Sequence, residues 1–99
     1  MEGLDPLLNA PARLQIAALL AKVTEMEFAK LRELVGVSDS VLSKHLAALA
    51  DAEHVRLRKA AMGGRQRTWA SLTRDGRRAL DAHVAALRAI VAHLPAAAE

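Results

Sequence analysis

Residues 37–49 constrain the fold most strongly, because they form a helical pattern with two unlike faces. One face is apolar and carries leucines at helical spacing, Leu42, Leu46 and Leu49. The other face is short, polar and mildly basic, and it carries Ser40, Ser43, Lys44 and Ala47. Ser38 can cap the helix through its hydroxyl, and Gly36 suits the left-handed end of a preceding helix. The stretch therefore predicts a helix, a tight turn and a second helix over residues 38–52.

The polar face of this second helix favours binding to DNA. Small side chains at the start of a helix let it enter the major groove, where bulky ones would hold it away from the base edges. Lys44 can donate to guanine O6 and N7 or to a phosphate, whereas a serine specifies a base only weakly. The candidate contacts from this helix are Ser38, Ser40, Ser43 and Lys44. The alternative is an ordinary amphipathic core helix with a solvated face. His45 lies beside the leucines and is expected to be a packed helix residue and not a reader of bases.

Basic residues are concentrated in one segment, from Arg56 to Arg78. This segment has eight basic side chains and a single acidic one, Asp75, so its net charge is +7, against +3 for the whole chain. Clustered charge of one sign indicates a polyanionic partner more firmly than the total does. The expected contacts with the DNA backbone or minor groove are Arg56, Arg58, Lys59, Arg65 and Arg67. Trp69 lies in the same segment and is expected to pack under arginine side chains or against a partner subunit.

A hairpin is expected where the period changes from helical to alternating. Its first strand, turn and return strand are predicted at residues 55–58, 60–66 and 67–72. Val55 and Leu57 should face the core, and Gly63 and Gly64 should make the turn flexible. Arg65 then lies at the tip, where a guanidinium can enter a narrow minor groove.

Two further helices are expected, over residues 9–22 and 74–94, while the first helix of the helix-turn-helix covers residues 28–35 and residues 24–27 form a short connection. Asn9 and Thr73 can cap the two further helices, because both side chains can accept a hydrogen bond from a first-turn N–H. Gly76 should be tolerable in the first turn of the last helix.

The last helix carries an apolar seam. Its leucines and valines recur at the spacing of a coiled coil, at Leu80, Val84, Leu87, Val91 and Leu94. Since this seam is longer than a three-helix core needs, we expect a homodimer through it, helped by the apolar start of the chain. The chain is then one domain, with a lead-in, a DNA-binding core, a dimerisation helix and a tail at residues 1–8, 9–73, 74–94 and 95–99.

The order helix, helix, helix, basic hairpin, helix resembles a winged helix-turn-helix. The segments VSDSVLSKHLAALADAEHV, GGRQRTWASLT and RDGRRAL are similar to those of the MarR/ArsR-like bacterial transcriptional regulators. They are most similar to a short branch described as a winged helix DNA-binding domain, whose members also begin with a segment like LDPLLNAPARL. The resemblance implies a mainly α fold with a small β-hairpin (α+β), namely a winged helix-turn-helix with a C-terminal dimerisation helix.

The same resemblance implies a function. It suggests a homodimeric repressor that binds a pseudo-palindromic operator in double-stranded DNA, with helix 38–52 in the major groove and wing 60–66 on the minor groove or backbone. The wing departs from the family pattern, because Gly63 and Gly64 stand where many MarR-type wings carry an aspartate before the arginine. A small-molecule effector stays open, since the chain is too short for most of the terminal helices that frame the ligand pocket of a full-length MarR protein.

An ArsR-like metal-responsive repressor is the main alternative. Asp81, His83 and His93 on the last helix resemble the zinc ligands of that group. His93 comes one residue early for the pattern, however, and a shift of one residue turns a helical side chain by about 100°. A dimer that binds protein and not DNA is a second alternative, and the basic hairpin argues against it.

The composition limits the remaining classes. There is no cysteine, which excludes disulfides and thiolate metal sites and agrees with a cytoplasmic protein. The carboxylates are scattered and no Gly-rich phosphate loop joins a strand to a helix, so we expect neither an enzyme nor a cofactor. No apolar run is long enough for a membrane span, and no signal peptide is expected.

Overall fold

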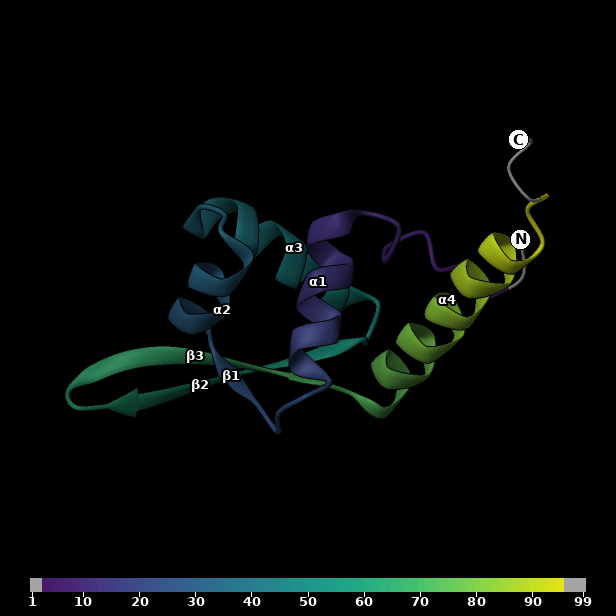
Figure 1. Ribbon diagram of the computed structural model, residues 1–99. Helices are drawn as coiled ribbons and strands as arrows, with labels where there is room; N and C mark the ends of the chain where they lie inside the picture. The colour runs from purple at the N-terminus through teal and green to yellow at the C-terminus, as the bar shows by residue number, and fades with distance from the viewer. Residues whose placement is uncertain (1–2, 96–99) are drawn as a thin grey trace.

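The computed structural model describes residues 3–95 and has four helices and one antiparallel sheet with the strand order β1-β3-β2. The elements in chain order are α1 (Pro11–Leu20), β1 (Met26–Glu27), α2 (Phe28–Val35), α3 (Asp39–Asp51), β2 (Val55–Met62), β3 (Arg65–Leu72) and α4 (Arg74–Ala92). Helices α1, α2 and α3 lie over one side of the sheet (Figure 1). The hairpin of β2 and β3 extends past them at one end, and α4 projects at the other. The expected α+β winged helix-turn-helix is confirmed.

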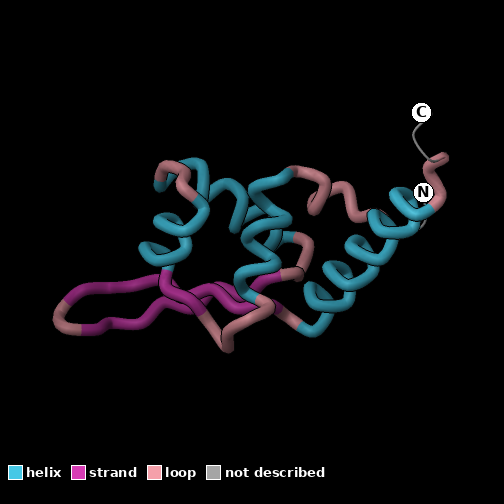
Figure 2. Tube along the Cα trace, viewed as in Figure 1, coloured by secondary structure: helices cyan, strands magenta, loops and turns pink. Residues whose placement is uncertain are grey.

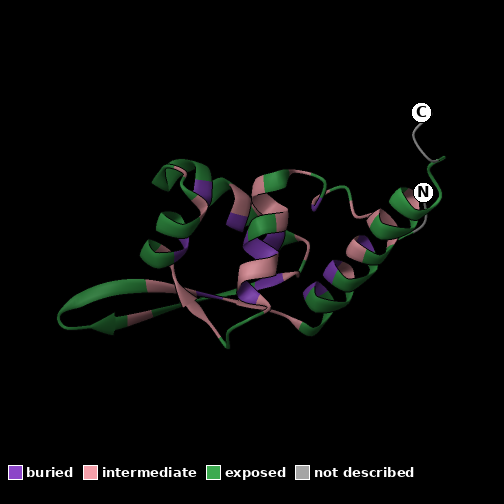
Figure 3. Ribbon diagram, viewed as in Figure 1, coloured by how far each residue is buried: buried purple, intermediate pink, exposed green. Residues whose placement is uncertain are grey.

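The core forms where the apolar sides of the helices meet the sheet. Its buried members come from every helix, from two strands and from the segment before α1: Leu8, Ile16, Ala17, Leu20, Leu31, Leu42, Leu46, Leu49, Val55, Ala70 and Leu80. Figure 3 shows these buried positions at the centre of the molecule and in the first half of α4, while the far part of the hairpin is exposed. Burial of this apolar surface is the main stabilising term of such a fold.

The expected ends of the helix-turn-helix are confirmed. Gly36 ends α2 with φ 76°, a left-handed conformation that glycine adopts without a steric cost. Ser38 caps α3, since its hydroxyl accepts a hydrogen bond from the Val41 N–H at 3.2 Å. The prediction that Asn9 caps α1 is wrong, because the residue at that position is Ala10, which makes no side-chain bond. Pro11 starts α1 instead, with a ring that already has the helical φ.

The strands are longer than predicted. Residues 26–27, expected as part of a connection, form β1 and pair with β3. The wing at residues 60–66 is not a flexible loop, because β2 and β3 pair as far as Met62 and Arg65 and leave only a two-residue turn (Figure 2). Gly63 and Gly64 both have positive φ, 60° and 78°, as the tight type I′ hairpin turn requires.

The prediction that Leu57 is buried in the core is wrong. This side chain was expected to point inward, yet it is 40% exposed. The strand order explains this, because β2 is an edge strand and the helices do not fully cover it.

The start of α4 is set by a close backbone contact. Thr73 caps the helix as expected and accepts a hydrogen bond from the Gly76 N–H at 2.8 Å. Its own N–H donates to the His54 carbonyl at 3.0 Å, and its hydroxyl donates to the Glu53 carbonyl at 2.6 Å, which holds the start of α4 against the segment after α3. A Cβ on Gly76 would lie 2.0 Å from the His54 carbonyl oxygen. Gly76 is therefore required here, not merely tolerated.

The other end of α4 is shorter than predicted. The helix stops at Ala92, so Leu94 lies beyond it, and residues 96–99 of the predicted tail at 95–99 fall outside the described residues. Within residues 3–95, no helix is both long enough and apolar enough to cross a bilayer.

Candidate nucleic-acid interface

The outer side of α3 is free of the core. Its exposed side chains include the expected polar set Ser40, Ser43, Lys44 and Ala47, whereas its leucines are buried. Ser38 is exposed as well, with its Oγ 3.3 Å from the Ser40 Oγ. The predicted division of this helix into a core face and a solvent face is confirmed.

His45 lies on α3 between these two faces and is half-buried. The Arg13 guanidinium of α1 approaches its Nδ1 at 3.3 Å, and the same arginine donates through Nε to the Leu7 carbonyl at 2.6 Å. His45 is thus a packed residue between α1 and α3, as expected.

Two features of this surface were missed from the sequence. Val41, in the first turn of α3, is 39% exposed and offers an apolar contact of the kind that suits a thymine methyl group. Arg32 of α2 forms an ion pair with Asp39 at 2.9 Å. An acid at the start of one helix that follows a base in the last turn of the previous one is the sequence signal that could have indicated this pair.

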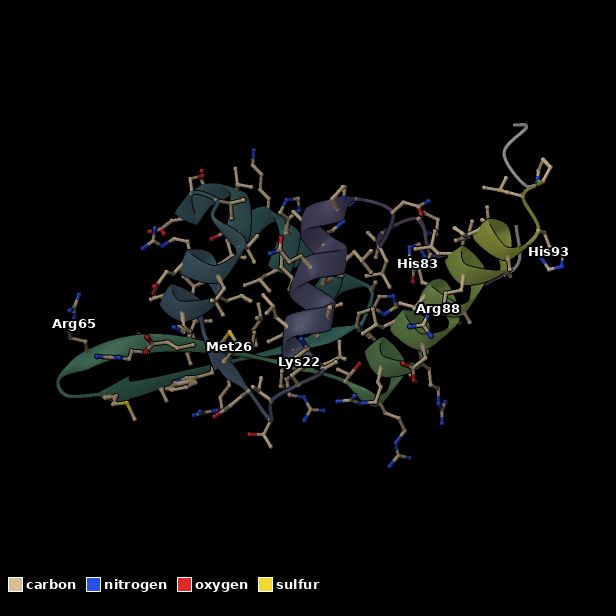
Figure 4. All side chains as sticks on the ribbon, in the orientation of Figure 1. Lys22, Met26, Arg65, His83, Arg88 and His93 are labelled. Carbon is tan, nitrogen blue, oxygen red and sulfur yellow. The ribbon has the colours of Figure 1, made fainter. Side chains whose placement is uncertain are left out.

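The hairpin of β2 and β3 carries the expected basic side chains, but they fall into two groups. Arg56, Lys59 and Arg65 are exposed and form no ion pair within residues 3–95. Arg65 stands at the tip of the hairpin, far from the body (Figure 4). Arg58 and Arg67 are instead bound by acidic side chains of the same chain.

The bound pair of arginines lies at the base of the wing. Arg58 donates to both carboxylate oxygens of Glu25, at 2.6 and 3.2 Å. These bonds raise the pKa of the Arg58 guanidinium above its ordinary value. Arg67 donates to Glu27 at 2.6 Å. Of the basic residues expected to contact phosphate, Arg58 and Arg67 are therefore less available to DNA than the others.

Trp69 packs under an arginine, as expected. The Arg58 Cζ lies 5.6 Å from the centroid of the indole ring, within the range of a cation–π contact. The indole Nε1 is buried and has no hydrogen-bond partner among the described residues.

A cleft separates the wing from the helix-turn-helix. Its volume is about 460 Å³, and its walls come from the start of α2, the start of α3 and the strand β3, including Phe28, Asp39, Arg65 and Arg67. The start of α3 and the basic part of the wing thus border the same opening. This arrangement brings together the two elements that were predicted separately as DNA contacts.

The seam predicted for dimerisation is divided between core and solvent. Leu80 is 7% exposed and belongs to the core of its own chain, and Val84 packs against that core. Leu87 is half-buried, whereas Val91 and Leu94 are 68% and 62% exposed. Beside them, an apolar groove of about 650 Å³ runs between α1 and α4, lined by Leu14, Ala18, Ala21, Leu80, Val84 and Ala85, with Lys22 and Arg88 among its polar side chains.

The three residues of the metal alternative do not converge within the chain. His83 is 1% exposed, and its Nδ1 accepts a hydrogen bond from the Asp5 N–H at 3.0 Å. Asp81 is exposed, and the exposed His93 ring lies 2.7 Å from the Ala89 carbonyl of its own helix. Over residues 3–95, no group of three potential ligand side chains gathers at one point.

His83 instead belongs to a hydrogen-bonded junction that fixes the lead-in. The Asp5 backbone binds His83 of α4, and the Asp5 carboxylate binds the His54 Nε2 at 2.7 Å. Burial alone would raise the pKa of the Asp5 carboxyl, but hydrogen bonds from His54 and the Leu7 N–H outweigh it and hold the pKa below its ordinary value. The lead-in is thereby tied to α4 and to the segment after α3.

Comparisons with known proteins agree with this architecture. A family model described as a winged helix DNA-binding domain matches residues 12–91. The structure of a transcriptional regulator homologue from Pyrococcus horikoshii OT3 is similar, with a TM-score of 0.80 and 22% identity over 87% of this chain and 85% of that one. No curated protein matches the chain.

Two longer MarR-family structures share the fold. Sco5413, a MarR family transcriptional regulator from Streptomyces coelicolor, has a TM-score of 0.67 and 22% identity over 86% of this chain and 61% of that one. A mutant of Lactococcus lactis ZitR in complex with DNA has a TM-score of 0.61 and 23% identity over 82% of this chain and 54% of that one. This chain therefore corresponds to little more than half of each of these two proteins.

Proposed function

This chain belongs to the winged helix DNA-binding domain family, and from that premise we propose that it is a homodimeric transcriptional repressor that reads a pseudo-palindromic operator. The observation that carries the proposal is the shared cleft, where the start of α3 at Asp39 and the basic strand β3 border one opening, next to the exposed polar face of α3. A duplex is the polyanion whose groove and backbone fit such a pair of elements.

The proposed division of labour follows from the side chains. Helix α3 enters the major groove, where Lys44 donates to guanine or phosphate and Ser40 and Ser43 make weaker contacts with base edges. Val41 lies close enough to the helix start to meet a thymine methyl group. The Ser38 hydroxyl accepts the Val41 N–H and still has its own hydrogen to donate, which suits a phosphate oxygen.

The wing contributes affinity more than sequence information. Arg65 at the tip enters the minor groove, where narrow A·T-rich stretches attract a guanidinium. Arg56 and Lys59 run along the backbone, and each phosphate that they neutralise releases counterions and makes binding depend on salt.

A homodimer provides the two-fold symmetry that such an operator requires. The candidate surface is the part of the seam that the chain leaves open, namely Leu87, Val91 and Leu94, beside the groove between α1 and α4. A two-fold interface would place two copies of α3 on successive turns of the duplex, about 34–36 Å apart.

Selection from a random duplex library tests this function. Purified protein should enrich a pseudo-palindrome whose half-sites are about 10 base pairs apart. Lys44→Ala is the matched variant, because Lys44 is exposed and its loss should spare the fold while it weakens the enrichment. Retention of all duplexes alike would contradict sequence-specific reading, and no retention at low salt would contradict DNA binding itself.

A further inference from the structure

Two glutamates at the base of the wing form ion pairs with its arginines, and these pairs affect how many basic side chains are available to bind DNA phosphates. We propose that Glu25 and Glu27 withhold Arg58 and Arg67 from the phosphate backbone, so that these arginines position the wing while Arg56, Lys59 and Arg65 bind. The inference rests on the proposed function, since it concerns the same DNA surface. It assigns a role to acidic residues that a count of basic charge overlooks.

In both ion pairs the arginine donates short hydrogen bonds to a glutamate carboxylate. Arg58 is held on two sides, by two hydrogen bonds to Glu25 and by the ring of Trp69. Arg67 donates to Glu27 at 2.6 Å, a short bond of the kind that charge assistance gives. A phosphate that recruits either arginine has to replace these contacts before it gains its own.

The sheet register explains why the glutamates reach these arginines. Glu27 pairs with Trp69, and Trp69 pairs with Arg58, so the three residues lie in one row across β1, β3 and β2. Directly opposed residues share a face of the sheet, and Arg67 lies two residues from Trp69 and shares that face too. The short strand β1, together with Glu25 directly before it, therefore forms an acidic border to the wing.

Burial makes the exchange with a phosphate unfavourable. The Glu27 side chain is only 19% exposed, and Arg67 is its ion-pair partner among the described residues. If Arg67 left it for DNA, a largely desolvated carboxylate would remain without that partner and close to an incoming phosphate of the same charge. Glu25 is 35% exposed and more easily released, so we expect its hold on Arg58 to be the weaker one.

The slope of log K against log salt measures how many charges reach phosphate, and a random duplex of about 20 base pairs is a suitable probe. Arg67→Gln and Arg58→Gln should leave the slope unchanged, although affinity can fall at every salt concentration if the wing is less firmly held. The matched Arg65→Gln should reduce the slope by about 1 per contact, or about 2 per dimer. Thermal melts of each variant separate loss of the fold from loss of contact.

Removal of the acids provides the opposite test. Glu27→Gln should release Arg67 and steepen the slope by up to about 2 per dimer. The double variant Glu27→Gln/Arg67→Gln should return to the wild-type slope, because no arginine remains to be released. A slope reduced by Arg67→Gln as much as by Arg65→Gln would overturn the proposal, and so would a slope that Glu27→Gln leaves unchanged. A wild-type protein that binds no duplex would instead refute the proposed function and, with it, this inference.

Discussion

The wing and the lead-in junction are both tied to the body by acidic side chains, yet the two ties differ in kind. At the base of the wing, Glu25 holds Arg58 across a surface where about half of the arginine side chain is open to solvent. At the junction, Asp5 meets His54 and His83, of which the first has a side chain 15% exposed and the second is fully buried. The tie at the wing is an ion pair exposed to solvent, whereas the tie at the junction consists of hydrogen bonds that are largely shielded from solvent.

This difference indicates which conditions should loosen each end. Dissolved salt screens exposed charges over about 8 Å at physiological strength, so the wing contacts should weaken as salt rises. The buried junction should ignore salt and respond to protons or to lost hydrogen-bond partners. The end proposed to bind DNA is therefore adjustable by the same ions that compete for DNA, while the end that carries α4 is fixed.

The largest expected effect lies at the α4 end. Leu87→Glu with Val91→Glu should give monomers, because two charges would be buried in the proposed interface, and sedimentation velocity would show the change. Loss of one half-site should weaken operator binding by about 1,000-fold, through the lost effective concentration.

Ala89→Glu is the matched control for that pair of changes. It lies on the same helix, is exposed and points to the opposite side, so it should keep the dimer. If the wild-type protein sediments as a monomer at tens of micromolar, or if the control dissociates as readily as the double variant, the dimer surface is wrong.

The next effect breaks the contact that joins α4 to the rest of the body. Gly76→Ala would force a methyl group against the His54 carbonyl, and we expect the free energy of unfolding to fall by about 3 kcal/mol. Gly36→Ala is the comparison, because nothing lies within 4 Å of its Cβ, and only the positive φ opposes it, at about 1 kcal/mol. Urea denaturation compares the two variants. Equal losses of unfolding free energy would mean that the backbone around Gly76 and His54 can shift to accommodate the methyl group at little cost.

Much of the helix-turn-helix could be predicted from residues 36–52, because its determinants are local. The helical spacing of the leucines, the serine cap and the left-handed glycine each act within one turn of the chain. The existence of the hairpin was predicted but its length was not, since the alternation fades where the strands leave the core and nearly every residue on both faces is exposed.

What could not be predicted depends on contacts between distant residues. The partner of Arg67 is Glu27, 40 residues away, and the partner of the Asp5 backbone is His83, 78 residues away. The side-chain types alone suggested phosphate for Arg67 and, in the metal-responsive alternative, a metal for His83, because nothing in the local pattern shows what the fold will bring beside them. The closeness of Gly76 to His54 is hidden for the same reason.

A smaller effect separates the two ties directly. Asp5→Ala removes the acceptor of His54 and of the Leu7 N–H, and should cost about 2 kcal/mol of unfolding free energy near neutral pH. Because the pKa of Asp5 is lowered in the folded state, its contribution is present above the ordinary value and is lost as pH falls through the folded pKa. The difference between wild type and variant should therefore shrink in acid below about pH 3.8.

Salt distinguishes this variant from its counterpart at the wing. Glu25→Ala should cost less than about 1 kcal/mol, and that cost should disappear in about 1 M salt, whereas the cost of Asp5→Ala should persist. Urea denaturation of both variants at low and high salt makes the comparison. A salt-sensitive Asp5 variant would show that the junction is a surface ion pair like the one at the wing.

The last effect concerns how α3 and the wing tip share the reading of DNA. Lys44→Ala should lose about 1 kcal/mol at the selected operator and less on a random duplex, so that discrimination falls, because its proposed partner is a base edge. Arg65→Ala should weaken both duplexes more evenly and make the salt slope shallower, because a guanidinium at a hairpin tip meets mainly phosphate and groove width. Fluorescence anisotropy on the two duplexes over a range of salt measures both quantities. The reverse pattern, with Arg65 controlling discrimination and Lys44 neutral, would make the wing the reading element and leave α3 as the part that only positions it.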